Sequence, residues 1–106
     1  MSGSDKDLYS GLIRLHVLHH AAESPIYGSW MIEELREHGY AISPGTLYPM
    51  LHGLARKGYL KVRQEGPGKR ARRLYRTTAK GRAALADAKG KVRELFGELF
   101  ESDSRS

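Results

Sequence analysis

The chain of 106 residues has no cysteine, which excludes both a disulfide framework and a metal site built on thiolates. It also lacks any apolar run near the roughly 20 residues that a membrane-spanning helix requires. The first seven residues, MSGSDKD, are polar and lack the apolar centre of a signal peptide. These absences predict one small cytoplasmic domain without a membrane partner.

The motifs of common enzyme classes are missing as well. The sequence contains no Gly-x-Ser-x-Gly elbow, no thiol nucleophile and no pair of carboxylates in an evident pocket. The segment Gly66-Pro67-Gly68-Lys69 places glycines before a lysine, but it lacks the spacing and the following helix of a phosphate loop. We therefore expect neither enzymatic activity nor a cofactor.

Acidic residues are nearly absent from residues 56–82. Eleven lysines and arginines lie there with one acidic residue, Glu65, so this stretch carries a formal charge of +10, whereas the rest of the chain carries −4. A basic face of this kind is typical of a nucleic-acid-binding protein. The alternative for a charge run taken alone is a solvated surface with counterions.

Hydrophobic periodicity predicts a mainly α-helical fold with a small β-hairpin. Apolar residues at helical spacing predict helices over residues 7–22 and 27–38, and a third that begins at Ser43 and ends at Gly58. The short turn between the second and third helices is typical of a helix-turn-helix.

The hairpin is expected directly after the third helix. Residues 59–63 alternate, so Leu60 and Val62 are predicted on the buried face of a strand. A glycine-rich turn follows, and residues 72–77 form the returning strand. The combination predicts a winged helix-turn-helix.

A fourth helix is predicted from Thr78, its N-cap, to about Phe100. Its apolar residues recur at spacings of three and four, as in the seam of a coiled coil, and they form a predicted dimer interface of Leu85, Ala88, Val92, Leu95, Phe96 and Leu99. Because the domain already has a core of its own, this seam predicts a homodimer. Packing on the first helix of the same chain is the alternative.

The chain is accordingly divided into two functional parts. Residues 7–77 are the predicted winged helix-turn-helix DNA-binding domain, and residues 78–101 are the predicted dimerisation helix. The polar ends, residues 1–6 and 102–106, are expected to be disordered.

The start of the third helix, SPGTLYP, has the features of a helix end that contacts DNA. Ser43 is a predicted N-cap and Pro44 suits the first helical position. Gly45 lets another surface come close, and Thr46 and Tyr48 bring hydroxyls to the positive end of the helix. Such an end suits a phosphate backbone, although an ordinary surface helix can start in the same way.

These motifs together resemble the PadR family of bacterial transcriptional regulators, over roughly residues 8 to 100. The resemblance rests on Tyr27-Gly28, Gly39, the run from Ser43 to Leu51 (SPGTLYPML), Gly58, the basic wing from Gly66 to Arg73, Tyr75-Arg76-Thr77-Thr78 and Gly81. Three departures stand out. Thr77 replaces a usual leucine, which predicts a weaker anchor for the wing. Trp30 replaces a polar residue, and a single C-terminal helix indicates the short-tailed branch.

The resemblance implies a homodimeric regulator, most often a repressor, that occupies a pseudo-palindromic operator. Its predicted contacts with double-stranded DNA are Ser43, Gly45, Thr46, Tyr48, Lys69, Arg70, Arg72 and Arg73. Tyr48 has an alternative place inside the protein, beside Tyr59. Two rival functions remain open: a winged-helix protein that binds DNA or RNA without sequence preference, and an adaptor for other proteins.

The resemblance also implies a small, flat hydrophobic effector at the dimer interface. The aromatic residues Trp30, Phe96 and Phe100 form the candidate effector site, because aromatic rings give flat ligands a stacking surface. The alternative is that both phenylalanines belong to the dimer core and the tryptophan covers it.

Histidines cluster on the first predicted helix. His16 and His20 have the i, i+4 spacing of metal-binding helices. No third ligand is evident beside them, although Asp7 or Glu23 could supply one, and histidines at the margin of a packed helix need no metal. The sequence therefore predicts no metal site.

Overall fold

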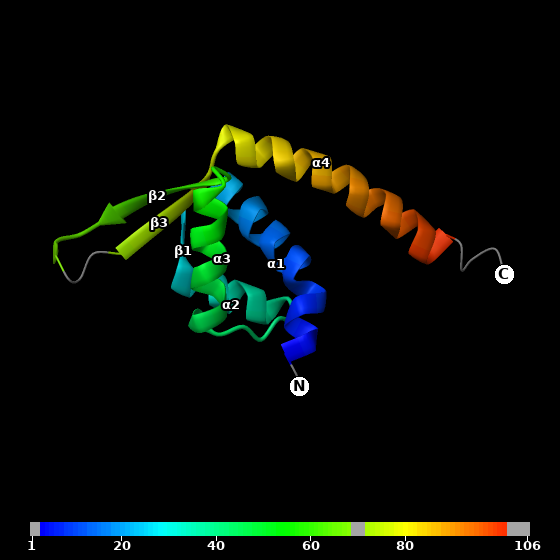
Figure 1. The fold of residues 1–106 in the computed structure, drawn as a ribbon, viewed down its shortest axis with the longest axis horizontal. Helices are drawn as coiled ribbons and strands as arrows, with labels where there is room; N and C mark the ends of the chain where they lie inside the picture. The colour runs from blue at the N-terminus through cyan, green and yellow to red at the C-terminus, as the bar shows by residue number, and fades with distance from the viewer. Residues whose placement is uncertain (1–2, 69–71, 102–106) are drawn as a thin grey trace.

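The computed structural model describes residues 3–68 and 72–101, which form a small helical domain with a hairpin on one side and a long helix on the other (Figure 1). The elements in chain order are α1 (Gly3–Glu23), β1 (Ile26–Tyr27), α2 (Gly28–Glu37), α3 (Pro44–Arg56), β2 (Leu60–Glu65), β3 (Arg72–Thr77) and α4 (Ala79–Phe96), followed by a π-helical turn (Gly97–Glu101). The predicted fold class is confirmed: a winged helix-turn-helix with a long C-terminal helix.

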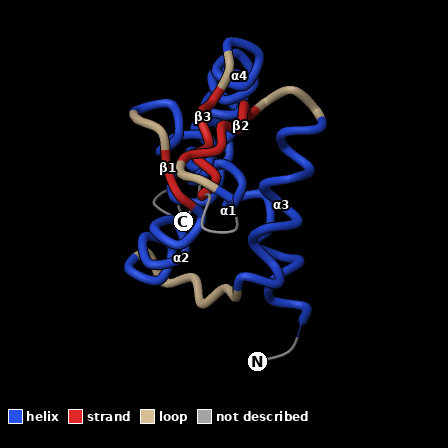
Figure 2. Tube along the Cα trace, turned by 90° about the vertical axis from the view of Figure 1, so that its left-hand side faces the viewer, coloured by secondary structure: helices blue, strands red, loops and turns tan. Residues whose placement is uncertain are grey.

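Two elements differ from the sequence-based expectation. Helix α1 begins at Gly3, four residues before the predicted start. A third strand, β1, pairs antiparallel with β3 and gives the sheet the order β1-β3-β2 (Figure 2). Two residues between two helices are too few to show strand alternation, so periodicity could not predict β1.

The β2–β3 hairpin is buried only at its base. Leu60 pairs with Thr77 there, and both side chains are buried. Val62, predicted to be buried, is 46% exposed. Alternation correctly placed Leu60 and Val62 on the same face, but the hairpin extends beyond the helices (Figure 1), so the described part of the chain covers Val62 only in part.

The domain core lies where α1, α2, α3 and the base of the hairpin meet. Its most deeply buried side chains come from all four elements: Val17, Met31, Leu35, Leu47, Leu51 and Tyr75. Each of the large aliphatic ones contributes about 1.5–3 kcal/mol by leaving water. This core fixes the orientation of α3, the helix that begins with SPGTLYP.

Two glycines allow elements to approach closely. The ring of Tyr48 in α3 packs on Gly28, where an added Cβ would lie 2.6 Å from Tyr48 Cε1. At the start of α4, a Cβ on Gly81 would collide with the backbone carbonyl oxygen of Tyr59. These contacts explain why any side chain at either position would force its neighbour to move.

The base of the wing is held by hydrogen bonds to the helices. Thr77 Oγ1 donates to the carbonyl oxygen of Leu18 at 2.8 Å, and the Thr77 side chain is only 2% exposed. Thr78 Oγ1 donates to the Gly58 carbonyl at 2.6 Å and accepts from Gly81 N at 3.0 Å, which confirms Thr78 as the N-cap of α4. The leucine expected at position 77 is thus replaced by a polar anchor.

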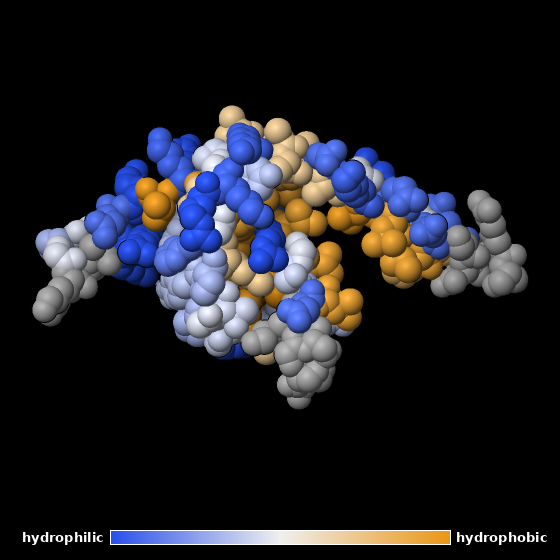
Figure 3. All heavy atoms as spheres, viewed as in Figure 1, coloured by the Kyte–Doolittle hydropathy of each residue, from blue (hydrophilic) through white to orange (hydrophobic). Residues whose placement is uncertain are grey.

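Helix α4 leaves the domain and gives the molecule extents of 60 × 34 × 21 Å. Apolar side chains gather on its side facing α1, and its outer side is hydrophilic (Figure 3). Among the described residues, no helix combines the length and the apolar character needed to cross a membrane.

Candidate nucleic-acid interface

The N-terminus of α3 is open to solvent. Ser43, Pro44 and Gly45 are exposed, and the Ser43 backbone is extended, with φ −92° and ψ 161°. The predicted capping role of the Ser43 side chain is wrong: its hydroxyl makes no hydrogen bond to the backbone and lies 3.4 Å from Thr46 Oγ1. The positive end of α3 therefore faces outward without its own side-chain cap.

Tyr48 lies at the junction of α2, α3 and the wing. It is half-buried, and its ring packs on Gly28 of α2. The alternative position named from the sequence was an internal one beside Tyr59. A polar cleft of about 460 Å³ opens beside it, lined by Tyr27, Gly28, Ser29, Tyr48, Gln64, Gly68, Arg72 and Arg73. Three predicted DNA-contacting residues, Tyr48, Arg72 and Arg73, thus share one cleft.

Arg72 is positioned by an aromatic ring. Its guanidinium carbon lies 3.8 Å from the centroid of the Tyr27 ring, within the range of a cation–π contact. The Tyr27 hydroxyl donates to Glu65 Oε1 at 2.6 Å, and Arg63 donates to Glu65 Oε2 at 3.0 Å. This set of contacts joins β1 to both strands of the wing.

Glu65, the only acidic residue in the basic stretch, is held as a carboxylate. The hydrogen bond from Tyr27 and, beyond it, the contacts with Arg63 lower its pKa, and the same hydrogen bond raises the pKa of the Tyr27 hydroxyl. A charged Glu65 at neutral pH orients the arginines around it.

Arg73 connects the wing to α3. Its Nη1 donates to His52 Nε2 at 3.0 Å, so the Arg73 side chain lies on the α3 side of the hairpin. The antiparallel register places Arg73 and Gln64 opposite each other, so both point to this side.

Sequence reasoning missed Tyr27 and His52, because only the fold brings them beside the wing, and it missed Gln64, which lies on β2 of the wing itself. A polar residue in the cleft carries no local pattern that distinguishes it from any other surface residue. Lys69 and Arg70, predicted to contact DNA from the wing tip, lie outside the described residues.

The predicted dimer seam divides into two halves. Leu85 is buried against the domain and Ala88 is half-buried, so the alternative of packing on α1 holds for the start of α4. Farther along, the seam is open: Val92, Leu95, Phe96, Leu99 and Phe100 are 44–58% exposed.

An apolar groove of about 700 Å³ separates the end of α4 from α1 (Figure 3). Its lining includes Leu12, Leu15, Leu85, Val92 and Phe96. Of the candidate effector residues, Phe96 lines this groove. The ring of Phe100 lies beside that of Phe96, with 4.7 Å between the two ring centroids. Trp30 is elsewhere: it lies on α2, and its ring meets that of His20 edge-on.

Comparison with known proteins identifies the family of the chain. Residues 17–87 match the family described as the transcriptional regulator PadR-like family. The chain belongs to this family. PadR-like regulators bind DNA and are not enzymes, which confirms the expectation of a DNA-binding regulator without catalytic activity.

Individual transcriptional regulators match nearly the whole chain. It is 44% identical over 101 residues to Transcriptional regulator Rv3488 of Mycobacterium tuberculosis (strain ATCC 25618 / H37Rv), with 95% of this chain and 94% of that protein covered. A PadR family transcriptional regulator from Eggerthella lenta DSM 2243 has a TM-score of 0.80 at 28% identity, covering 93% of this chain and 88% of that one. A transcriptional regulator from Clostridium thermocellum has a TM-score of 0.75 at 25% identity, covering 91% and 96%.

Proposed function

We propose that this PadR-like protein is a homodimeric repressor that binds a pseudo-palindromic operator. One observation carries the proposal: Tyr48 at the start of α3 and Arg72 and Arg73 of the wing line a single polar cleft beside the open N-terminus of α3. Tyrosine side chains and guanidinium groups that line one cleft, close to an exposed helix N-terminus, suit a phosphate backbone. Such a protein acts in the compartment that holds the DNA, here expected to be the cytoplasm.

The start of α3 mainly positions the protein on the duplex. Ser43, Thr46 and Tyr48 offer hydroxyls, and Gly45 lets the backbone approach, but SPGTLYP contains no arginine, asparagine or glutamine. Those residue types make the strong bidentate contacts to base edges. Operator preference then comes largely from DNA shape and deformability.

The wing supplies positive charge beside this helix. Arg72 and Arg73 are exposed yet already oriented, by the Tyr27 ring and by His52. Fixed side chains lose less rotamer freedom on binding, so their contacts contribute more affinity. Lys69 and Arg70 extend the proposed contact along the tip.

The open half of the α4 seam supports the dimer. Leu95, Phe96 and Leu99 are each about half exposed, an unusual state for large apolar side chains on one helix face. A second α4 packed along this face buries them, and a two-fold axis then sets two wings on one side of the dimer. Half-sites are expected about one helical turn apart, or a multiple of it.

The apolar groove beside the seam supports release by a small, flat hydrophobic effector. Because it lies between α1 and α4, a ligand there changes how the dimerisation helix sits on the DNA-binding domain. Phe96 and Phe100 are the proposed stacking residues, whereas Trp30 does not line the groove and its ring contacts His20 instead. Titration with planar hydrophobic compounds should weaken operator binding by the wild-type chain and leave Phe96→Ala unaffected.

Selection of genomic DNA fragments by the purified protein tests the proposed function. Enrichment of one short pseudo-palindrome supports an operator-specific regulator. Uniform recovery of fragments would instead support a non-specific nucleic-acid-binding protein, and no recovery would support a protein-interaction adaptor. The affinity for the selected site should also fall about 10³- to 10⁵-fold between about 50 mM and 200 mM salt.

A pair of matched variants locates the interface. Arg73→Ala removes a charge from the cleft, and Lys91→Ala removes one from the exposed outer side of α4, where it pairs with Asp87. Arg73→Ala should weaken operator binding and reduce its salt dependence, whereas Lys91→Ala should change neither. If Arg73→Ala and Lys91→Ala changed operator affinity equally, the contact with DNA would lie outside the cleft.

A further inference from the structure

Three histidines from two helices converge on one side of the domain. His16 and His20 lie on α1, and His38 caps the end of α2. One imidazole nitrogen from each lies within 4.8 Å of the other two. The three rings form a triangle: the centroid of His16 lies 4.9 Å from that of His38 and 6.1 Å from that of His20, and the latter two are 6.2 Å apart. The third ligand that the sequence did not reveal is therefore His38, eighteen positions beyond His20.

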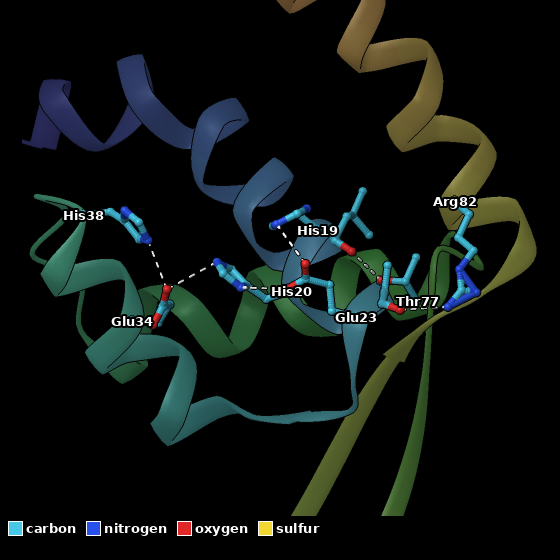
Figure 4. A network of polar contacts seen from close by, with 9 residues as sticks. His19, His20, Glu23, Glu34, His38, Thr77 and Arg82 are labelled. Atoms are coloured by element: carbon cyan, nitrogen blue, oxygen red, sulfur yellow. Dashed lines mark hydrogen bonds and ion pairs between the residues drawn. The ribbon is translucent and has the colours of Figure 1, made fainter.

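A carboxylate completes the set. Glu34 Oε2 lies 3.0 Å from His38 Nε2 and 3.5 Å from His20 Nε2, between the two rings (Figure 4). Three imidazoles and one carboxylate are a common ligand set for Zn²⁺ and related divalent ions. The carboxylate is placed either to bind the ion directly or to orient the rings around it.

Burial favours the neutral form of the two histidines of this set that lie on α1. Burial, and after it the neighbouring His38, His20 and His19, lower the pKa of His16; burial also lowers that of His20. Neutral imidazole is the form that binds a metal ion.

We propose that His16, His20 and His38, together with Glu34, bind a divalent transition-metal ion of the Zn²⁺ class. The nitrogens must close from 4.8 Å to about 3.4 Å, as set by Zn–N bonds of about 2.0–2.1 Å at a tetrahedral centre. Side-chain torsions of exposed and half-buried rings can supply this movement. The site is accessible to an ion, since His38 is about half exposed.

A second set of side chains overlaps the first. His19, His20 and Glu23 also bring ligand atoms within 4.8 Å of one another, but all three come from the last turns of α1. His19 and Glu23 are more exposed than His16, so this set excludes less water from an ion. The set that joins two helices is therefore the stronger site, and the experiment distinguishes the two.

The metal would join α1 to the end of α2. The turn that follows His38 leads within five residues to Ser43 at the start of α3, and His16 also lines the groove between α1 and α4. An ion held here restricts the turn of the helix-turn-helix and contacts one wall of the groove. Resting on the proposed function, we infer that metal occupancy changes operator affinity.

The direct test is metal binding by the purified full-length chain without DNA. Zn²⁺ is titrated at neutral pH, and Co²⁺ replaces it to report the geometry by visible absorption. The proposal predicts one ion per chain, a tetrahedral Co²⁺ spectrum and a rise in Tm with Zn²⁺. Absence of stoichiometric binding, or an octahedral Co²⁺ spectrum from water-rich surface binding, would overturn it.

Histidine variants identify the ligands. His38→Gln should abolish the tetrahedral Co²⁺ spectrum, and Glu34→Gln should weaken Zn²⁺ binding by about 10- to 100-fold. His52→Gln, outside the cluster, is the control and should bind Zn²⁺ as the wild type does. Loss of binding in His19→Gln with retention in His38→Gln would assign the metal to the other set. Circular dichroism of each variant checks that α1 and α2 remain folded.

Operator binding is then measured with and without Zn²⁺. The inference predicts that Zn²⁺ changes the affinity of the wild type and not that of His38→Gln. If neither protein binds an operator, the proposed function fails while the metal site stands or falls on the binding titration. If the wild type binds Zn²⁺ and its operator affinity is unchanged, the site is structural and the regulatory role is overturned.

Discussion

The domain core and the outer half of α4 contain similar apolar side chains in opposite surroundings. Leu47 and Leu51 of α3 are completely buried, whereas Leu95 of α4 and Leu99 of the π-helical turn after it are about half exposed. The chain's own fold removes the first pair from water, and it leaves the second pair in contact with water. The difference teaches that the chain's own fold covers the side chains of the core, while the end of α4 keeps an apolar face that another surface can cover.

The largest effect on protomer stability is expected in the core. Leu51→Ala should lower the free energy of unfolding by about 2–5 kcal/mol, because it leaves a cavity among α1, α2 and the hairpin. The matched change Val62→Ala on the exposed wing should cost less than about 0.5 kcal/mol. Chemical denaturation measures both; similar losses would contradict the burial described for the two residues.

Next comes the junction between the core and α4. Gly81→Ala should destabilise the protein by about 1–3 kcal/mol, since the new Cβ meets the carbonyl oxygen of Tyr59. Gly90, on the same helix, has open space around it, so Gly90→Ala should stabilise the helix by about 0.5–1 kcal/mol. Thermal denaturation of the two variants should therefore shift Tm in opposite directions.

The anchor of the wing should have a smaller effect. Thr77→Val keeps the shape of the side chain and removes the hydrogen bond to the Leu18 carbonyl, at a cost of about 0.5–1.5 kcal/mol. Faster hydrogen exchange should appear at the base of β3 before the core of α3 is affected. A uniform change across both elements would show that the wing and the core unfold as one unit.

Acidification should produce the smallest and most local effect. The folded wing lowers the pKa of Glu65 below its ordinary 4.5, mainly through the Tyr27 hydroxyl, so the unfolded chain binds a proton there more readily. The contribution of this contact is complete above that value and is lost as the pH falls through the lowered pKa. The protection factors of β1 and β3 amides, which compare the observed exchange with the intrinsic rate at the same pH, should fall in acid, and Glu65→Gln should remove that fall.

Much of the fold could be predicted from the sequence because the signals were local. Periodicity and turn residues gave α2, α3 and β3 almost to the residue, and Thr78 was correctly identified as an N-cap. Local signals failed where the burial or the hydrogen bonding of a side chain depends on the surroundings of its helix or strand. Val62 alternates correctly but projects past the core, and the Ser43 hydroxyl bonds to no backbone group.

The candidate site was less predictable than the fold. The SPGTLYP run and the basic wing could be predicted as two parts of the site, since charge and the residues of a helix start are visible in the sequence. Tyr27, His52 and His38 contact residues between 18 and 45 positions away, at distances that no spacing rule covers. Their roles follow only from the way the core sets α2, α3 and the wing together.

Sedimentation of the full-length chain and of Leu99→Glu tests the central claim, a dimer held by α4 that presents two wings to DNA. The wild type should sediment at twice the 11.9 kDa protomer mass and bind its operator as two chains. Leu99→Glu should sediment as a folded monomer with much weaker operator binding, because a charge cannot be buried in the seam without a partner. A wild-type monomer that binds the operator tightly, or an unaltered Leu99→Glu dimer, would contradict the account.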